Sequence, residues 1–248
     1  LAIMLQETGT TPVFVTRGYG GSERGVLRVD LTKHTAKQVG DEALLLARVA
    51  PTWVGRNRAA AIQAAEAHGT HVILDDGLQN PSINPDLAFL VVDGDTGLGN
   101  GCLIPAGPLR ETLNEAMQRI TAMILIGVRD EQSIASRTRC PVLRANWQAN
   151  LPNDFPKSQK FFAFAGIGRP EKFYKTCLAA GLTIVGTQDF SDHHEFTSND
   201  LKRLKQLAHS MDAQLLTTEK DWVRLPQDAQ AKITAFPVKL IFDEPGMM

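Results

Sequence analysis

The stretch "HVILDDGLQN" at residues 71–80 places an apolar run directly in front of two carboxylates. Residues 72–74 predict a short strand, which Asp75 and Asp76 end before Gly77. Because successive strand side chains point to opposite faces, one of the two acids tends to face the buried side of the sheet, where an unpaired charge is costly. The stretch is therefore either a turn that ends a strand or an acidic site that a cation compensates.

Short apolar runs and helical patterns alternate on both sides of this strand. Residues 26–31 and 36–40 predict a hairpin or a small excursion from this pattern. The alternation favours an α/β fold with a mostly parallel sheet and helices on its faces. The predicted strands are residues 12–18, 52–55, 71–76, 87–93 and 122–127, and the predicted helices are 1–9, 41–50 and 56–69.

The later part of the chain shows the same alternation on a smaller scale. Residues 94–112 are rich in glycine and proline and predict a long functional loop, and residues 148–160 predict a linker. We therefore expect two parts, residues 1–150 and a smaller α/β subdomain at residues 151–248. The predicted strands beyond the linker are 161–167, 182–187, 213–218 and 238–242, with helices at 170–180 and 198–211.

Composition excludes several classes of protein. The 248 residues carry a formal net charge of -1, with 43% hydrophobic and 21% charged residues, as is ordinary for a globular protein. A general nucleic-acid binder usually has a basic excess, so we expect no nucleic-acid partner. The three cysteines form no C-x-x-C pair and predict reduced thiols without a zinc site. No apolar run approaches the roughly 18 residues that span a bilayer.

Two acidic stretches are candidates for chemistry, although each also has a structural interpretation. Asp41 and Glu42 open a predicted helix, where acids are common as caps and favour the helix dipole. The loop "FSDHHEFT" places Asp192 beside His193 and His194. An acid next to two histidines suits general acid–base chemistry, but such histidines are also often simply exposed or hydrogen-bonded.

Two further loops carry paired charges. Arg110 and Glu111 follow a proline-stiffened loop and form either a solvated ion pair or a site for developing phosphate charge. Lys220 and Asp221 follow a predicted strand, and structural ion pairing is the favoured interpretation there. The chain has no Gly-Lys dipeptide, so the phosphate-binding motif G-x-x-x-x-G-K-[ST] is absent from these residues, and "GLGNG" at 97–101 does not replace it.

Seven motifs in collinear order resemble one family. They are "TRGYGG", "VGDE", "DDGLQN", "GNGCLIPAGPLRE", "AFAGIGRPEKFY", "FSDHHEFT" and "TTEKDWVRL", and together they are similar to the tetraacyldisaccharide 4'-kinases of Gram-negative bacteria. The resemblance runs from about residue 1 to residue 243. It implies a P-loop-kinase-like fold and transfer of the γ-phosphate of ATP to the 4'-hydroxyl of a lipid A disaccharide precursor, in lipid A biosynthesis.

The resemblance also assigns roles to the acids and to one histidine. By this match Asp75 and Asp76 hold Mg²⁺ against ATP, and Asp41 is the general base on the sugar hydroxyl. His193 pairs with Asp41. A metal bound to both acids would answer the question that the strand end raises.

The remaining matched residues lie in three loops. By the resemblance, Arg110 assists catalysis and Glu111 lies beside the nucleotide phosphates. Arg17, Tyr19 and Gln79 match the acceptor-binding side. An alcohol that attacks a phosphoryl group needs positioning and charge neutralisation more than covalent chemistry, so this set of residues is chemically coherent.

The sequence departs from the family at two places. Family members begin with a membrane-associated helix, a strand and the P-loop, whereas this chain begins at Leu1 within a predicted helix. We therefore expect an N-terminally incomplete kinase core at residues 1–150, and little or no phosphoryl-transfer activity in the 248-residue polypeptide alone. Asn80 stands where the family usually has histidine. The family further implies a monomer that binds the cytoplasmic face of the inner membrane through the N-terminal helix.

Two other functions are compatible with these residues. One is a P-loop-free, non-catalytic paralogue that binds a lipid or a protein partner. The other is an ATP-dependent enzyme of the P-loop class that acts on a soluble small molecule. Binding to anionic lipid vesicles or to the lipid A precursor would favour the lipid kinase over the second alternative.

Overall fold

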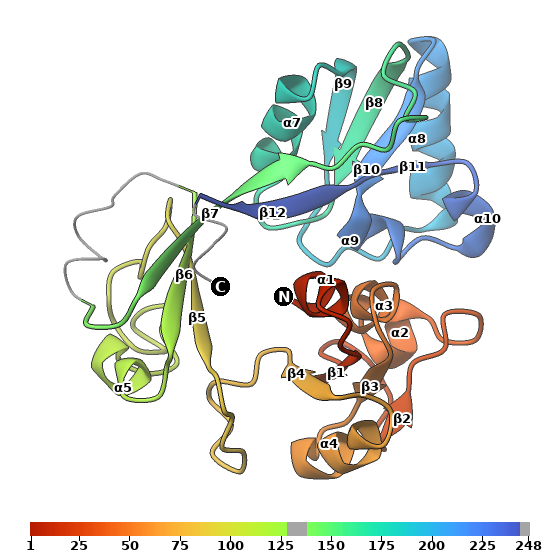
Figure 1. Ribbon diagram of the computed structural model, residues 1–248. Coiled ribbons are helices and arrows are strands. Elements are labelled where there is room, and N and C mark those ends of the chain that lie inside the picture. The colour runs from red at the N-terminus through yellow and green to blue at the C-terminus, as the bar shows by residue number, and fades with distance from the viewer. Residues whose placement is uncertain (128–137, 244–248) are drawn as a thin grey trace. The chain divides into compact units, whose positions relative to one another are not determined.

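The computed structural model describes residues 1–127 and 138–243, which form two compact units (Figure 1). The first unit combines residues Leu1–Gly77 with Leu151–Pro237. The second combines residues Leu78–Asn150 with the chain from Val238 onward. Within the described ranges, no helix has both the length and the apolar character that crossing a membrane requires.

The first unit contains two four-stranded sheets, and the first of them is built by its N-terminal segment. The strand order is β2-β3-β1-β4, in which β1 pairs in parallel with β3 and β4, and β2 pairs antiparallel with β3. The elements are α1 (Ala2–Glu7), β1 (Pro12–Thr16), β2 (Leu27–Arg28), α2 (Ala36–Val39), α3 (Asp41–Ala47), β3 (Thr52–Val54), α4 (Arg58–Glu66) and β4 (His71–Leu74).

Alternation along β1 explains why every residue of this strand is buried. Val13 and Val15 pack on one face with Ala61 of α4. Phe14 points to the other face and packs with Ala2 of α1. Both faces of the strand are therefore covered by helices, as is usual for a parallel sheet.

The second sheet of this unit is entirely parallel and has the order β11-β10-β8-β9. Helices α7 and α8 flank it (Figure 1). The elements are β8 (Lys160–Ala165), α7 (Pro170–Ala179), β9 (Thr183–Asp189), α8 (Ser198–Ser210), β10 (Gln214–Thr218), α9 (Glu219–Trp222), α10 (Gln227–Gln230) and β11 (Thr234–Phe236).

Strand β8 also alternates between two covered faces. Phe162 and Phe164 pack with Leu204 of α8. Phe161 lies on the opposite face, where its ring contacts Phe155 with a centroid separation of 6.0 Å. Aromatic side chains of this size supply much of the apolar area that a sheet buries, so they anchor the second sheet between its helices.

The two sheets of the first unit share one hydrophobic cluster. Val223, which follows α9, packs with Val39 and Ala43 of the helices beside the first sheet. The guanidinium of Arg48, at the end of α3, lies 4.7 Å from the ring centroid of Trp222. The start of α3 and the segment after β10 are therefore held against each other.

The second unit is built on one mixed sheet. Its order is β12-β7-β6-β5, with parallel pairing from β5 to β7 and antiparallel pairing between β7 and β12. Residues 94–112 form the predicted irregular loop. The elements are β5 (Phe89–Asp93), α5 (Leu113–Met117), β6 (Ala122–Ile126), β7 (Val142–Ala149) and β12 (Val238–Phe242).

The structure corrects the prediction for residues 26–40. Only Leu27–Arg28 forms a strand, which pairs with β3, and Ala36–Val39 is helical. A capping box causes this, because the side chains of Thr35 and Gln38 satisfy each other's backbone N–H groups. A capped turn of helix therefore takes the place of the second half of a hairpin.

The compact units also differ from the predicted division at residue 150. Residues 1–77 and 151–237 belong together, whereas 78–150 form the second unit with β12. The predicted last strand of the subdomain, residues 238–242, pairs with β7, and β11 occupies the edge next to β10. Pairing between strands far apart in sequence leaves no local pattern, so a consecutive division could not reveal it.

Candidate functional site

The two acids of the opening stretch lie at the carboxyl end of β4, as predicted. The backbone N–H of Asp75 donates to the carbonyl of Val15 (3.0 Å), which continues the pairing with β1. The Thr16 hydroxyl donates to Asp75 Oδ2 (2.9 Å). Asp76 is exposed and has a left-handed φ of 50°. The turn therefore fixes Asp75 in the sheet edge and presents the Asp76 side chain to solvent.

A buried arginine supports this turn. Arg58, the first residue of α4, is only 5% exposed, and its Nη2 donates to the carbonyl of Asp75 (2.8 Å). Burial lowers the pKa of its guanidinium, while the carboxylates of Asp75 and Asp76 act in the opposite direction. Its Nη1 is buried and has no hydrogen-bond partner in the described structure. The sequence analysis missed Arg58, because an arginine in a helical pattern gives no signal of burial.

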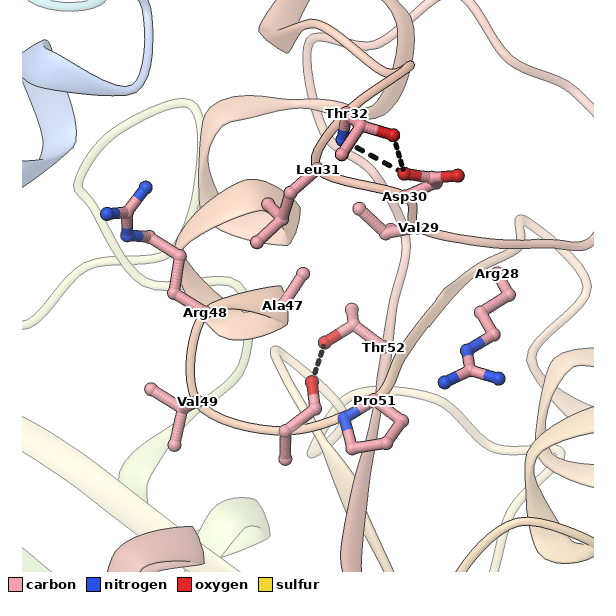
Figure 2. A pocket seen from close by; sticks show the side chains of 11 residues that line it. Arg28, Val29, Asp30, Leu31, Thr32, Ala47, Arg48, Val49, Pro51 and Thr52 are labelled. Atoms are coloured by element: carbon pink, nitrogen blue, oxygen red, sulfur yellow. Dashed lines mark hydrogen bonds between the residues drawn. The ribbon is translucent and has the colours of Figure 1, made fainter. Parts of the chain in front are cut away.

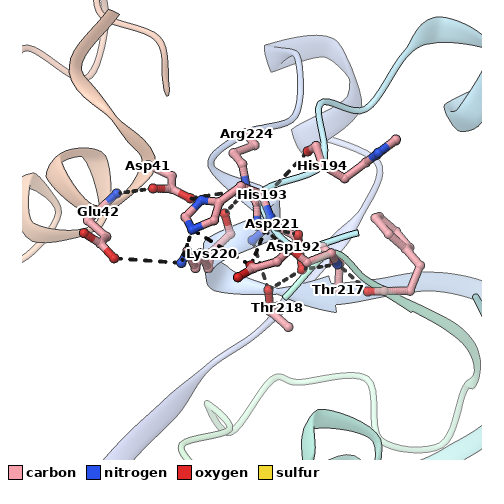
Figure 3. A network of polar contacts seen from close by, with 12 residues as sticks. Asp41, Glu42, Asp192, His193, His194, Thr217, Thr218, Lys220, Asp221 and Arg224 are labelled. Carbon is pink, nitrogen blue, oxygen red and sulfur yellow. Dashed lines mark hydrogen bonds and ion pairs between the residues drawn. The ribbon is translucent and has the colours of Figure 1, made fainter. Parts of the chain in front are cut away.

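A second group of charged residues begins at α3. Asp41 is only 6% exposed, and its Oδ2 lies 3.1 Å from His193 Nδ1 (Figure 3). Asp41 Oδ1 accepts the backbone N–H of Glu42 (2.9 Å). His193 has a left-handed φ of 57°, and its N–H donates to the carbonyl of Gly166 (3.1 Å). The structure thus brings together the acid and the histidine that the sequence analysis paired.

The neighbours of His193 define its tautomer. Lys220 Nζ lies 3.3 Å from His193 Nε2. A lysine ammonium only donates, so Nε2 is the acceptor and Nδ1 carries the hydrogen that is donated to Asp41. Lys220 Nζ also lies 3.8 Å from Glu42 Oε1. Lys220, interpreted from the sequence as a structural ion pair, is therefore in direct contact with the histidine.

Glu42 links the two groups of acids. Its pKa is raised, first by burial and then by the nearby carboxylate of Asp75, while the Lys220 ammonium lowers it. Asp41 contributes in the same direction as Asp75. The end of β4 and the start of α3 are therefore within electrostatic reach of each other, and three carboxylates share one region.

A pocket of about 570 Å³ lies next to the Asp41–His193 pair. Tyr19 lines it, and the Tyr19 and His193 rings meet edge to face with their centroids 6.3 Å apart. Apolar side chains, including Leu44 and Phe196, form other parts of the wall. The predicted acceptor residue Tyr19 is therefore beside the predicted base.

Arg17, the other residue of this loop that was predicted to bind the acceptor, follows β1 and is exposed. Its charge is felt at Arg58. Arg17 thus lies nearer to the turn with the two acids than its sequence position alone suggests.

A larger pocket of about 700 Å³ is lined by residues 28–32 and 47–52 (Figure 2). None of the predicted site residues lines it. Its polar contacts are local, such as the Thr52 hydroxyl that donates to the Ala50 carbonyl (2.9 Å). We therefore place the candidate site at the smaller pocket.

Three predicted site residues belong to the second unit and are described within it. Gln79 Nε2 donates to Glu111 Oε1 (2.9 Å), and Arg110 Nη1 lies 3.5 Å from Gln79 Oε1. Arg119 forms an ion pair with Glu111 and donates to the carbonyl of Leu78 (2.9 Å). The sequence analysis missed Arg119, which ties the "DDGLQN" loop to the "PAGPLRE" loop.

Asn80, the departure from the family pattern, has a local role. Its Oδ1 accepts the backbone N–H of Ser82 (3.0 Å) and the Ser82 hydroxyl (2.7 Å). Asparagine side chains commonly stabilise turns in this way. Asn80 therefore shapes the loop that follows Gln79.

The carboxylates at the end of β4 suit a hard cation. Mg²⁺ prefers oxygen donors and is usually held by one or two carboxylates together with phosphate oxygens. Asp75 and Asp76 supply such donors. Within residues 1–127 and 138–243, no group of three or more histidine, cysteine or acidic side chains is arranged to hold a metal by itself.

The fold places the chain in the class of P-loop-kinase-like α/β proteins. It superposes on LpxK from Aquifex aeolicus in complex with ATP with a TM-score of 0.74, at 23% identity, over 98% of this chain and 78% of that one. This likeness shows the fold. A model of the family described as "Tetraacyldisaccharide-1-P 4'-kinase" matches residues 1–248. The chain belongs to this family.

Relatives with curated descriptions agree with this membership. The tetraacyldisaccharide 4'-kinase of Maricaulis maris is 46% identical over 253 residues, which cover 98% of this chain and 73% of that protein. The enzyme of the same description from Rhodospirillum centenum is 46% identical over 249 residues, with the same coverage. The resemblance found in the seven motifs is confirmed.

Proposed function

We propose that this protein transfers the γ-phosphate of ATP to the 4'-hydroxyl of a tetraacyldisaccharide 1-phosphate. Family membership supports the reaction, and the hydrogen bond between Asp41 and His193 is the observation that carries the mechanism. The pair lies at a pocket large enough for part of a sugar, and next to the acids that suit Mg²⁺. The proposed place of action is the cytoplasmic face of the inner membrane.

The acceptor hydroxyl must lose a proton as the phosphoryl group arrives, so a base must be held in position. In the proposed mechanism Asp41 and His193 act as one unit in which the Nδ1–H of His193 stays directed at Asp41. Tyr19 and Arg17 orient the sugar. Asp41, which is 6% exposed, is the proposed acceptor of the hydroxyl proton. A buried group held in position needs no reorganisation at the moment of reaction, which favours Asp41 as the base.

Asp75 and Asp76 are the proposed ligands of Mg²⁺, which neutralises phosphate charge when it is bound. By family membership, Gln79 is proposed to bind the acceptor, Arg110 to assist phosphoryl transfer and Glu111 to bind near the nucleotide phosphates. The contacts among these residues support this proposal. Arg119 holds the Glu111 carboxylate, which accepts a hydrogen bond from Gln79, and Gln79 in turn accepts one from Arg110.

The proposed reaction also needs a loop that cradles the phosphates. Such a loop requires backbone N–H groups and a lysine after a glycine, and these 248 residues contain no Gly-Lys pair. We therefore propose that a polypeptide of these residues alone turns over little or no substrate. Clear 4'-kinase turnover by that polypeptide would contradict this part of the proposal.

The test uses protein expressed from the complete reading frame that encodes these residues. Transfer of label from γ-labelled ATP to tetraacyldisaccharide 1-phosphate is measured for the parent, Asp41→Ala, His193→Ala and the double variant. Each single change should lower kcat by roughly 10²–10⁴-fold, as loss of a general base does. Because the two residues act as a unit, the double variant should lose little more than the worse single variant.

The neighbouring histidine offers a matched control. His194 Nε2 pairs with Asp200 (3.1 Å), and its ring stacks on Phe190, so His194→Ala removes an imidazole of the same loop without touching Asp41. It should retain most of the activity. Additive losses at Asp41 and His193 would contradict the shared role. Transfer to soluble alcohols in preference to the disaccharide would contradict the proposed acceptor.

A further inference from the structure

A buried ion pair lies directly behind the Asp41–His193 pair. Arg224 Nη2 binds Asp221 Oδ1 at 2.7 Å, and the two side chains are 7% and 0% exposed. Figure 3 shows both residues next to His193 and Asp41. An ion pair removed from water costs free energy unless further hydrogen bonds satisfy it, so its remaining contacts indicate what it serves.

Besides local bonds to Thr218 and Lys220, these contacts reach both backbone groups of Gly166. Asp221 Oδ2 accepts the N–H of Gly166 (3.0 Å), and Arg224 Nη2 donates to the Gly166 carbonyl (3.0 Å). The same carbonyl accepts the backbone N–H of His193 (3.1 Å). Arg224 Nη1 also lies 3.4 Å from the His194 carbonyl. The buried pair therefore holds the backbone on both sides of His193.

The backbone of His193 needs such support. A non-glycine residue with a φ of 57° lies in a sparsely populated region and persists only where the surroundings hold it. Its side chain must also stay 3.1 Å from Asp41, which comes from another element. The hydrogen bond from the His193 N–H to the Gly166 carbonyl fixes the histidine backbone, and the contact with Asp41 fixes its ring.

Arg224 also contacts Asp41, the acid of the pair. Its Nε lies 3.5 Å from Asp41 Oδ2, the oxygen that also faces His193. One planar guanidinium thus reaches the acid directly and the histidine through the Gly166 carbonyl. A lysine has a single ammonium and cannot reproduce this forked geometry.

We infer that the Asp221–Arg224 pair is a positioning device that sets the distance and tautomer of the Asp41–His193 pair. The inference rests on the proposed function, in which those two residues act as one unit. Neither Arg224 nor Asp221 is proposed to contact the substrate, and Arg224 reaches the Asp41–His193 pair at the Asp41 carboxylate. Their effect is transmitted through Gly166 and through the Asp41 carboxylate.

Two variants test the inference. Arg224→Lys keeps the charge but loses the fork. Gly166→Ala changes no charge and adds a Cβ that would meet Asp221 Oδ1 and the Ser191 carbonyl at 3.1 Å, a tight contact that moves the junction by a few tenths of an ångström. Because the alanine variant removes no ion pair, it tests the inference even if Arg224→Lys does not fold.

The control is Arg28→Lys. The Arg28 guanidinium lies 5.4 Å from the ring centroid of Trp53 in the first sheet, and Arg28 lines the larger pocket but not the pocket beside Asp41. The same arginine-to-lysine change therefore weakens a cation–π contact of the same unit away from the candidate site. All variants are made in the protein from the complete reading frame and compared for kcat, for KM and, by ¹⁵N NMR of labelled histidine, for the Nδ1–H signal of His193.

The expected result for Arg224→Lys is a fall of about 10–100-fold in kcat, with KM changed by less than about threefold, since misplacing a catalytic group slows the chemical step. Gly166→Ala should lower kcat by roughly fivefold or more. In both variants the Nδ1–H signal should broaden or disappear, whereas Arg28→Lys should keep both the signal and kcat.

Three results would overturn the inference. They are an unchanged Nδ1–H signal and kcat in Arg224→Lys and Gly166→Ala, a rise in KM alone, and an equal loss of kcat in Arg28→Lys. The NMR comparison needs no turnover. If the parent protein proved inactive on the disaccharide, the proposed function would fail while the NMR signals still decided whether the ion pair positions His193.

Discussion

Two ionic networks, one in each unit, differ in burial. In the first unit Asp221 and Arg224 are 0% and 7% exposed, and hydrogen bonds saturate the aspartate. In the second unit Glu111 and Arg119 are 17% and 43% exposed. Water can replace a lost partner in the second network but cannot reach the first. The same combination of an arginine and a carboxylate therefore holds the backbone rigidly in the first unit. In the second unit water can take over its hydrogen bonds, so the pair contributes less.

The largest effect is expected from Asp221→Asn. The change removes the closer of the two carboxylates beside the buried Arg224 guanidinium, and breaking a buried ion pair typically costs about 3–5 kcal/mol of unfolding free energy. Urea denaturation followed by circular dichroism measures this loss. Asp228→Asn, at an exposed aspartate of α10, is the control and should change stability by less than about 0.5 kcal/mol. A cost below about 1 kcal/mol for Asp221→Asn would remove the contrast between the networks.

A smaller effect is expected from Glu111→Gln. Arg119 is partly exposed and regains water when its partner loses charge, so the loss should be about 1 kcal/mol. Fluorescence of Trp147, which lies on β7 in the same unit, reports the urea transition. Asp86→Asn removes an exposed carboxylate of that unit and serves as the control. A loss as large as that of Asp221→Asn would show that this network is not replaceable.

Glu42→Gln sharpens the comparison through pH. Glu42 has a raised pKa in the folded protein, chiefly because of burial, so folding disfavours its ionised form. The parent therefore loses stability as pH rises from the unfolded value near 4.5 through the folded pKa, and the variant does not. The difference in unfolding free energy, variant minus parent, should increase over that pH range and then level off. A difference that stays flat with pH would contradict the raised pKa of Glu42, whose side chain is 49% exposed.

The smallest effect is expected at the surface. Lys37 and Glu195 approach to 2.7 Å, but their side chains are 75% and 72% exposed. Lys37→Ala should change the unfolding free energy by less than about 0.5 kcal/mol, and added salt should reduce the difference further. Thermal unfolding at low and high ionic strength measures both. A larger loss of unfolding free energy that does not depend on salt would show that exposure does not decide how much these ion pairs stabilise the protein.

Much of the fold could be predicted from local patterns. Apolar runs revealed β1, β4, β6 and β8, and the acids after β4 lie at the strand end that the sequence indicated. The helix start at Asp41 was also readable, because acids favour the first turn of a helix, although Gly40 and not Asp41 occupies the cap position. Local patterns fix elements and the residues that end them.

What failed was whatever depends on distant pairing. β12 pairs with β7 across about 90 residues, so its unit could not be inferred from its own sequence. Distant contacts also explain why three arginines were missed. Nothing in the local sequence shows which residues an arginine contacts in the fold, as for Arg58, Arg119 and Arg224. The pairing of Asp41 with His193 came from a family resemblance and not from the residues alone.

The interrupted chain path of the first unit has a consequence for protein synthesis. Residues 1–77 emerge from the ribosome before the 73 residues of 78–150, and only afterwards does the segment 151–237 appear. Val223 follows Gly77 by 146 residues, so at about 5–20 residues per second it appears roughly 7–29 seconds later. During that time Val39 and Ala43 lack Val223, their partner in the shared cluster. The hydrophobic cluster around Val39 and Ala43 is therefore incomplete until the last part of the unit has been made.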